Sequence, residues 1–316
     1  MTSLDRRTLF AGGLALTLSP AAPALARVLR QEPSREFQVR TNVANARYIK
    51  HRPKVAVASY GVSFFYTGKT RTMSGGGGAR IDTALYGVSP QMMTEVAEAA
   101  CLDLRARLAA AGETVVGVDE TRAALAAANT PLRDGNQFQG QGTFDGVTVA
   151  QRWLTVGSQT APMVTGYSGE ANSMLAGIGT RNRLAAASAA LDAIILTPVM
   201  WLDYARMRAR RGVGVEGEVV VGVRAAPSGF IVSAADPRGR LVMATLSVAD
   251  DVYSSQSYAM DVSSVSDPSG LQALMNVNMS HARIIADPAR WTPIALDAAR
   301  GYNAGLTDAV RQIRAG

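Results

Sequence analysis

The sequence predicts an α/β (α+β) fold: a mixed β-sheet with flanking helices, a β-meander in the C-terminal half and a C-terminal helix. Helical and β-type patterns alternate in the first half of the chain, and β-type segments cluster in the second half. The composition agrees, because 47% of the 316 residues are hydrophobic and 18% are charged, as in a folded globular protein.

The first 26 residues have the order of a cleavable signal peptide. A basic start is followed by an apolar stretch too short to cross a bilayer, and Ala24-Leu25-Ala26 fits a small-residue cleavage site. Arg6-Arg7, with Thr8-Leu9-Phe10 after it, resembles a twin-arginine (Tat) signal, and an ordinary Sec signal is the alternative. We therefore expect a periplasmic or secreted protein, with export by the Tat route favoured over Sec.

The rest of the chain offers no membrane anchor by pattern. No later segment approaches the roughly 20 apolar residues of a transmembrane helix. The one cysteine, Cys101, is far from the cleavage site, so we expect no lipoprotein, and its helical pattern favours a buried thiol. The net charge of +7 allows contact with anionic glycan or lipid head groups, whereas no motif indicates nucleic-acid binding.

The polar, Arg-rich residues 27–52 are interpreted as a linker, and residues 53–316 as a single domain, with a subdivision near residue 211 as the alternative. Residues 54–66 predict a central strand that is apolar on both faces at its start. Glycines at 75–78 indicate a loop. Ser89 and Pro90 then predict the start of a helix. Its apolar stripe consists of Met93, Ala97, Ala100, Cys101, Leu104 and Leu108.

A short strand at 114–118 and a helix at 119–128 come next. Within residues 130–178, rich in Gly, Gln, Ser and Thr, only 147–156 predicts a strand. An Ala-rich helix at 181–191 leads into a long strand over 192–210.

The second half predicts three strands, at 217–225, 229–235 and 240–248, as a β-meander with a turn at 236–239. Residues 254–268 are expected to be mostly loop, and a helix or short strand to follow near 271–285. Thr292 and Pro293 predict the start of the terminal helix. One face of that helix carries Ile294, Ala298, Tyr302, Leu306, Val310 and Ile313.

No motif predicts a cofactor, a metal or a catalytic residue. The Gly68-Lys69-Thr70 stretch has Ser63 where a phosphate loop needs glycine, and two histidines with one cysteine are too few for a zinc site. Ser168 lies in an incomplete G-x-S-x-G motif, with only His51 and His281 as possible bases. Because the sequence has so few recognisable catalytic groups, we favour a non-enzymatic protein. An exported hydrolase of an envelope polymer, using carboxylates or Ser168, stays as the alternative.

The segment after residue 202 predicts the one candidate binding face. In a continuous strand, alternation places Tyr204, Arg206, Arg208 and Arg210 on the same side. Guanidinium groups in a row bind carboxylates or phosphates, which suggests an anionic glycan or lipid. A solvated sheet face whose charges discourage edge pairing is the other interpretation.

Residues 54–60, 92–108 and 113–119, followed by the Ala-rich helix and Leu191-Asp192-Ala193, resemble the opening of the TolB N-terminal, CsgG, FlgO and LpoB group of bacterial envelope proteins. The chain departs from that group in its Gly-rich insertions at 74–78 and 130–178 and in lacking a lipobox cysteine. The resemblance implies a non-catalytic module that binds other envelope proteins or copies of itself. We therefore expect an exported periplasmic protein that acts by protein–protein contacts in cell-envelope or surface-appendage assembly.

Overall fold

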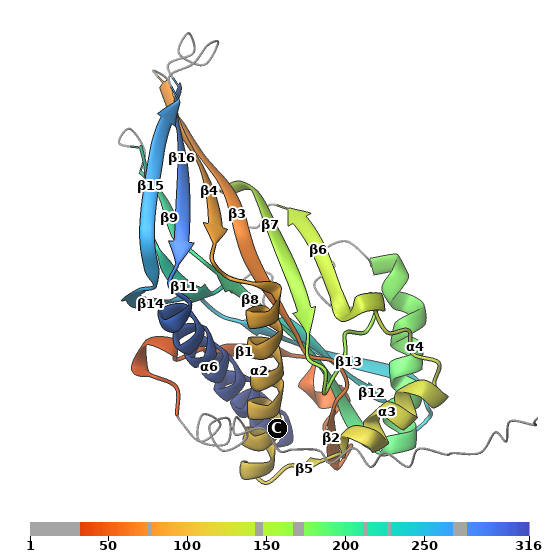
Figure 1. Cartoon of the computed structure of the whole chain (residues 1–316). Coiled ribbons are helices and arrows are strands. Elements are labelled where there is room, and N and C mark those ends of the chain that lie inside the picture. Colours follow the sequence, from red (N-terminus) through yellow and green to blue (C-terminus); the bar gives the residue numbers. More distant parts are fainter. Residues whose placement is uncertain are drawn as a thin grey trace, which may run out of the picture. The chain divides into compact units, whose positions relative to one another are not determined.

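The computed structural model describes residues 32–74, 77–142, 148–166, 174–210, 214–225, 229–267 and 277–315. This part of the chain is a mixed α/β fold, as predicted, with a large sheet, flanking helices and a C-terminal helix (Figure 1). The helices are α2 (Pro90–Ala110), α3 (Val118–Ala127), α4 (Met174–Leu191) and α6 (Pro288–Ala315), with short 3-10 turns η1 (Arg35–Phe37), η2 (Ala46–Tyr48) and η3 (Asp134–Asn136).

The strands run through most of the chain. They are β1 (Thr41–Ala44), β2 (Lys54–Val57), β3 (Gly61–Ser74), β4 (Gly77–Tyr86), β5 (Thr114–Val115), β6 (Gln137–Gly142), β7 (Thr148–Gly157), β8 (Ala193–Asp203), β9 (Arg206–Arg210), β10 (Gly214–Glu218), β11 (Val220–Val223), β12 (Gly229–Ala235), β13 (Leu241–Val248), β14 (Val252–Ser257), β15 (Ala259–Asp267) and β16 (Val277–Ala286). Within the described residues the main sheet has the order β1-β13-β12-β8-β3-β4-β16-β15, and β9 pairs with β10 in a separate sheet.

Strand β8 is the centre of the sheet and is buried along its whole length. It pairs in parallel with β2 and β3 and antiparallel with β11 and β12. The predicted central strand over 54–66 is thus divided, since β2 and β3 are separated by residues 58–60 and pair with successive halves of β8. Val55 and Val57 face the core beneath α2 and α6, whereas Ala56 faces α3 and α4. Helices on both faces explain why this run is apolar throughout.

Helix α2 begins where the sequence predicts. The Ser89 hydroxyl accepts a hydrogen bond from Met92 N at 3.2 Å, and Pro90 is the first helical residue. The predicted stripes of α2 and α6 are both buried. Helix α6, however, begins at Pro288, where Asp287 Oδ1 accepts from Ala289 N at 2.9 Å. The predicted start at Thr292 and Pro293 is therefore wrong, and Pro293 lies inside the helix.

Residues 34–52 are part of the fold, so the predicted linker is wrong for this range. Phe37, Val39 and Ile49 are buried, and β1 pairs with β13. The backbone of Phe37 and Val39 rests on Gly301 and Gly305 of α6. A Cβ at either glycine would come within 2.1 or 2.4 Å of a carbonyl oxygen of this segment. Its buried apolar residues are too widely spaced to produce a periodic pattern. Residues 27–31 lie outside the described range.

The second half contains more strand than its composition indicates. Strands β12 and β13 form the predicted hairpin, closed by Asp236 N to Arg240 O at 2.8 Å, but β11 pairs with β8 and β14, so the meander is limited to that hairpin. Residues 254–268 were expected to be mostly loop and instead supply most of β14 and all of β15. Serines occur at successive positions, on both faces of these strands, and so hide the alternation. Residues 277–286 form a strand, and β6 is an additional strand within 130–178.

The predicted strand over 192–210 ends at Asp203, and β9 starts at Arg206 in the second sheet. Among the described residues, no helix is both long and apolar enough to cross a membrane.

Candidate functional site

The sheet continues past the ends of α2 and α6 as an extension made of β3 after Phe65, β4, β15 and β16, with β7 beside β3 (Figure 1). Strand β16 runs parallel to β4, and β15 is the outermost strand. Because residues paired across strands lie on the same face of a sheet, the register divides the extension into two faces. We call them the outer face and the inner face.

The outer face is basic. Lys69 pairs with Asp82, which pairs with His281, and Arg71 pairs with Arg80. Basic positions on this face outnumber acidic ones; they are Lys69, Arg71, Arg80, Arg152 and Arg283, against Asp82, Asp261 and Asp267. Arg80 binds Asp82 at 2.8 Å, whereas Lys69, Arg71 and Arg152 are exposed and form no ion pair with any described residue. These charges are available to a partner.

An aromatic and apolar margin borders the basic residues. The Arg283 guanidinium lies over the Tyr86 ring, 4.8 Å from its centroid, and Tyr86 is 48% exposed. On β15, Met260 is 70% exposed at a break in the β15–β16 register. Val262, which is 50% exposed, pairs with Ile284 and so belongs to the inner face. The margin therefore combines Tyr, Arg and Met.

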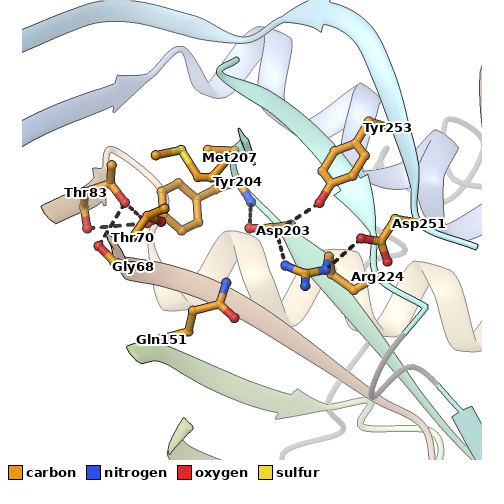
Figure 2. Close-up of a pocket in the computed structure, with 11 residues that line it drawn as sticks. Gly68, Thr70, Thr83, Gln151, Asp203, Tyr204, Met207, Arg224, Asp251 and Tyr253 are labelled. Carbon is orange, nitrogen blue, oxygen red and sulfur yellow. Dashed lines mark hydrogen bonds and ion pairs between the residues drawn. The ribbon is translucent and has the colours of Figure 1, made fainter. Parts of the chain in front are cut away.

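A polar cavity of about 120 Å³ lies on the inner face, beside β3, β4 and β7 (Figure 2). Thr70, Thr83 and Gln151 contribute one wall, and all three are buried. Met207 of β9 lies on the other side of the cavity.

The opposite wall is an ion-pair network that joins three segments of the chain. Arg224 Nη1 donates to Asp203 Oδ2 at 2.8 Å, and Arg224 Nε lies 3.2 Å from Asp251 Oδ2. The Tyr253 hydroxyl donates to Asp203 Oδ2 at 3.3 Å. Although burial lowers the pKa of Arg224, its interactions with Asp203, Tyr253 and Asp251 together outweigh burial and hold that pKa above its ordinary value. The guanidinium is therefore charged at any physiological pH.

Tyr253 reaches this network because Gly222 has no side chain. Gly222 pairs with Asp203 on one side and with Tyr253 on the other. A Cβ at Gly222 would lie 2.2 Å from Tyr253 Cδ1, so the ring occupies that space. Burial raises the pKa of the Tyr253 hydroxyl, which thus stays protonated and remains a donor to Asp203.

The structure separates the predicted binding residues from one another. Tyr204 is 3% exposed, and its hydroxyl lies 2.5 Å from Thr83 Oγ1 across the cavity. It therefore shares no surface with Arg206, which is 40% exposed and lies 3.8 Å from Glu218. The assumption of one continuous strand through Tyr204 was wrong, because the chain turns after Asp203.

The register of β9 and β10 shows which residues lie opposite the predicted binding arginines of β9. Arg206 pairs with Glu218, Arg208 with Glu216 and Arg210 with Gly214. Opposite charges at paired positions stabilise a two-stranded sheet, which favours a structural role for at least the first two arginines. The side chains of Arg208 and Arg210 lie outside the described set.

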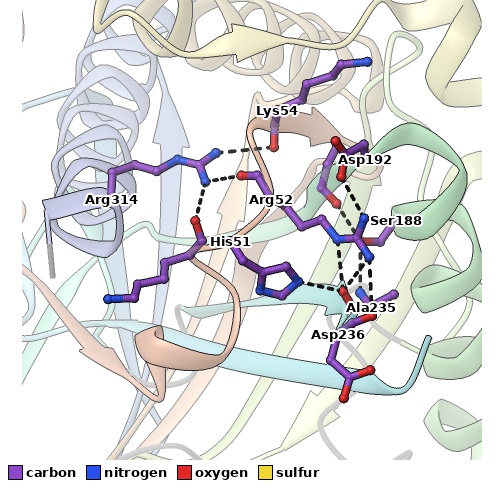
Figure 3. Close-up of polar contacts among 10 residues, drawn as sticks. His51, Arg52, Lys54, Ser188, Asp192, Ala235, Asp236 and Arg314 are labelled. Atoms are coloured by element: carbon purple, nitrogen blue, oxygen red, sulfur yellow. Dashed lines mark hydrogen bonds and ion pairs between the residues drawn. The ribbon is translucent and has the colours of Figure 1, made fainter. Parts of the chain in front are cut away.

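The two histidines lie apart from each other and from the cavity. His51 Nε2 is 3.0 Å from Ala235 O, beside Arg52, which donates to the same carbonyl and to Asp192 Oδ1 (Figure 3). These contacts, with Arg314 donating to Arg52 O, tie the N-terminal segment to β12 and α6. His281 is exposed on the outer face. Ser168 lies outside the described residues.

The other motif candidates acquire no chemical role. Gly68, Lys69 and Thr70 lie within β3, paired on both sides, so they form no phosphate loop. In the described part of the chain, no group of three or more His, Cys, Asp or Glu side chains could hold a metal ion.

Sequence reasoning missed the cavity. Asp203 and Arg224 each directly follow an apolar run, at the ends of β8 and β11, and a charged residue in that position is the signal that was available. Comparison with protein-family models, curated proteins and solved structures gave no match, so the function is argued from this chain's own residues.

Proposed function

We propose that this chain is an exported periplasmic protein that acts by protein–protein contacts in cell-envelope or surface-appendage assembly, and that its outer face binds an acidic partner surface. The exposed Arg283–Tyr86 stack, on the same face as Lys69 and Arg71, is the observation that carries the proposal. Export rests on the N-terminal sequence pattern.

The chemistry of the outer face favours a protein partner over a bare anionic polymer. Tyr, Met and Arg are the residue types enriched where proteins bind each other, and Tyr86, Met260 and Arg283 are exposed on or beside this face. Unpaired basic side chains steer an acidic partner and fix its orientation. An anionic lipid or glycan surface would bind through the basic side chains alone and would not require the exposed Tyr and Met.

The test measures which envelope proteins bind to the immobilised mature chain. Wild type is compared with the triple variant Lys69→Glu, Arg71→Glu and Arg283→Glu. The matched control reverses three exposed arginines elsewhere, as Arg240→Glu, Arg290→Glu and Arg311→Glu. We expect a discrete set of acidic proteins to be retained by wild type and control, lost by the outer-face variant, and released as salt rises.

Retention of the same proteins by both triple variants would contradict the proposal. So would binding to phosphatidylglycerol vesicles that is lost in the outer-face variant while no protein is captured, because that result assigns the face to a lipid surface.

The export route is tested separately. A folded reporter behind residues 1–31 should reach the periplasm, and Arg6→Lys with Arg7→Lys should block it. Unchanged export of the double variant would indicate a Sec signal, and cytoplasmic retention of the unaltered fusion would contradict export.

A further inference from the structure

We infer that the cavity on the inner face is a binding site for a small organic ammonium ion. This site is independent of the proposed function, because its lining residues lie on the side of the sheet opposite to the outer face.

Gln151 supplies the first observation. Its side chain extends from β7 toward the space between Tyr204 and Arg224 (Figure 2). The residue is 4% exposed, and its Oε1 atom has no hydrogen-bond partner among the described residues. A buried carbonyl oxygen without a donor is costly, because it has lost its contacts with water and gained none. Oε1 therefore calls for a ligand that carries an N–H or O–H donor.

The charges of the cavity select a cation. Asp203 and Asp251 both contact Arg224, so the lining contains two carboxylates and one guanidinium. The formal charge of these three side chains is −1, and a bound ammonium ion would balance it. An anion would instead have to compete with both carboxylates for Arg224.

The size of the cavity limits the ligand. A volume of about 120 Å³ is slightly smaller than the cavity of roughly 150 Å³ that holds benzene in another protein, so about six heavy atoms is the upper limit. Asp251, with 39% of its side chain exposed, marks the side that opens to solvent. Met207 and Ala205 offer apolar contact for a short alkyl chain.

The geometry thus assigns each part of the ligand to a set of side chains. The ammonium group would donate to Gln151 Oε1 and lie near the Asp203 and Asp251 carboxylates, and the alkyl part would lie against Met207. The hydroxyl groups of Thr70 and Thr83 already have partners in the wall of the cavity. Thr83 Oγ1, for example, donates to Gly68 O at 3.2 Å.

The experiment titrates the mature protein with propylammonium chloride, using 1-propanol and sodium propionate as the neutral and anionic probes of matched size. Binding is followed by ligand-observed NMR, and the occupied position by a crystal structure grown with propylammonium. We expect saturable millimolar binding of propylammonium alone, with its nitrogen within hydrogen-bond distance of Gln151 Oε1.

Two variants locate the interaction. Gln151→Leu keeps the size of the side chain and removes the acceptor, and Asp251→Asn removes one charge at the more exposed residue. Each should weaken binding by roughly tenfold, the effect expected when one hydrogen bond or charge contact to an ion is lost. Gln141→Leu, at an exposed position of neighbouring β6, is the matched control and should bind like wild type.

Several results would overturn the assignment. One is that 1-propanol binds as tightly as propylammonium, and another is that propylammonium shows no saturable binding. A crystal grown with propylammonium that contains only ordered water in the cavity would also do so, as would an unchanged affinity for propylammonium in both Gln151→Leu and Asp251→Asn. If Gln151→Leu fails to fold, Asp251→Asn and the crystal structure decide the question.

Discussion

Arg224 and Asp203 form an ion pair in the interior, with Nη1 and Oδ2 2.8 Å apart and only 6% and 3% of their side chains exposed. The pair joins the end of β8 to the end of β11. Removing one member of a buried pair is costly, because the other member stays out of water and loses a partner. This relationship gives the clearest stability prediction for the chain.

We expect Asp203→Ala to lower the free energy of unfolding by about 3–5 kcal/mol, because the buried Arg224 guanidinium would lose the carboxylate to which Nη1 donates. Urea denaturation followed by circular dichroism measures the change. The control is Asp250→Ala, which removes the exposed Arg40–Asp250 pair and should cost less than about 1 kcal/mol. Equal losses in the two variants would show that the buried pair has no special role.

Gly222→Ala should destabilise the protein by about 1–3 kcal/mol, since the new methyl group would overlap the Tyr253 ring. Adding Tyr253→Ala should remove the overlap, so the double variant should lose less than the sum of the two single losses. Thermal or urea unfolding of the four proteins measures this coupling. Gly117→Ala is the control, with only Glu120 Cβ at 3.9 Å from the new atom. Strict additivity would contradict the packing argument.

Glu98 of α2 predicts a dependence of stability on pH. Burial raises its pKa, but hydrogen bonds from Ser158 and Thr160 outweigh burial, so the pKa lies below its ordinary value of 4.5. A carboxyl with a lowered folded-state pKa stabilises the fold above its unfolded pKa and loses this contribution as pH falls through the folded one. Glu98→Gln should therefore cost about 1–2 kcal/mol at pH 7 and much less near pH 3.

Urea unfolding of wild type and Glu98→Gln between pH 3 and pH 7 tests this. Glu95→Gln, at an exposed position of the same helix, should show a small difference that does not vary with pH. A constant gap between wild type and Glu98→Gln across the range would refute the assignment.

Cys101 should be unreactive in the folded protein. It is 0% exposed, and burial raises the pKa of its thiol to about 12, so almost no thiolate is present at pH 8. We expect a disulfide reagent to label the native protein no faster than it unfolds, and the urea-unfolded protein at once. Full labelling of the native protein within minutes would show that the site opens without global unfolding.

The sequence was most informative where one residue decides a local event. Ser89 and Pro90 predicted the start of α2 because both act within the first helical turn. The start of α6 was misplaced because Asp287 is an equally good cap five residues before Thr292, and local chemistry does not rank the two. Strands β14 and β15 were missed because serines occupy successive positions on both of their faces, which weakens the alternation used to recognise a strand.

The candidate sites depended on register and on turns between elements. Lys69, Arg71 and Arg283 are far apart in the sequence and share a face only because β16 pairs in parallel with β4. Tyr204 was grouped with Arg206 because a pattern of alternation cannot reveal that the chain turns after Asp203. Gln151 resembled any other strand glutamine until the inner face enclosed it.

By itself, the sequence determined the fold class, the apolar faces of α2 and α6 and the buried central strand, because these depend on hydrophobic periodicity along one element. It also carries the export pattern, which is read along the chain. The tertiary structure alone decided that residues 34–52 belong to the fold, that the outer face is basic, and that Asp203, Arg224 and Gln151 surround one cavity. Those features arise from contacts between segments distant in sequence, whose pairing depends on the summed packing of the whole sheet and is encoded in no single local pattern.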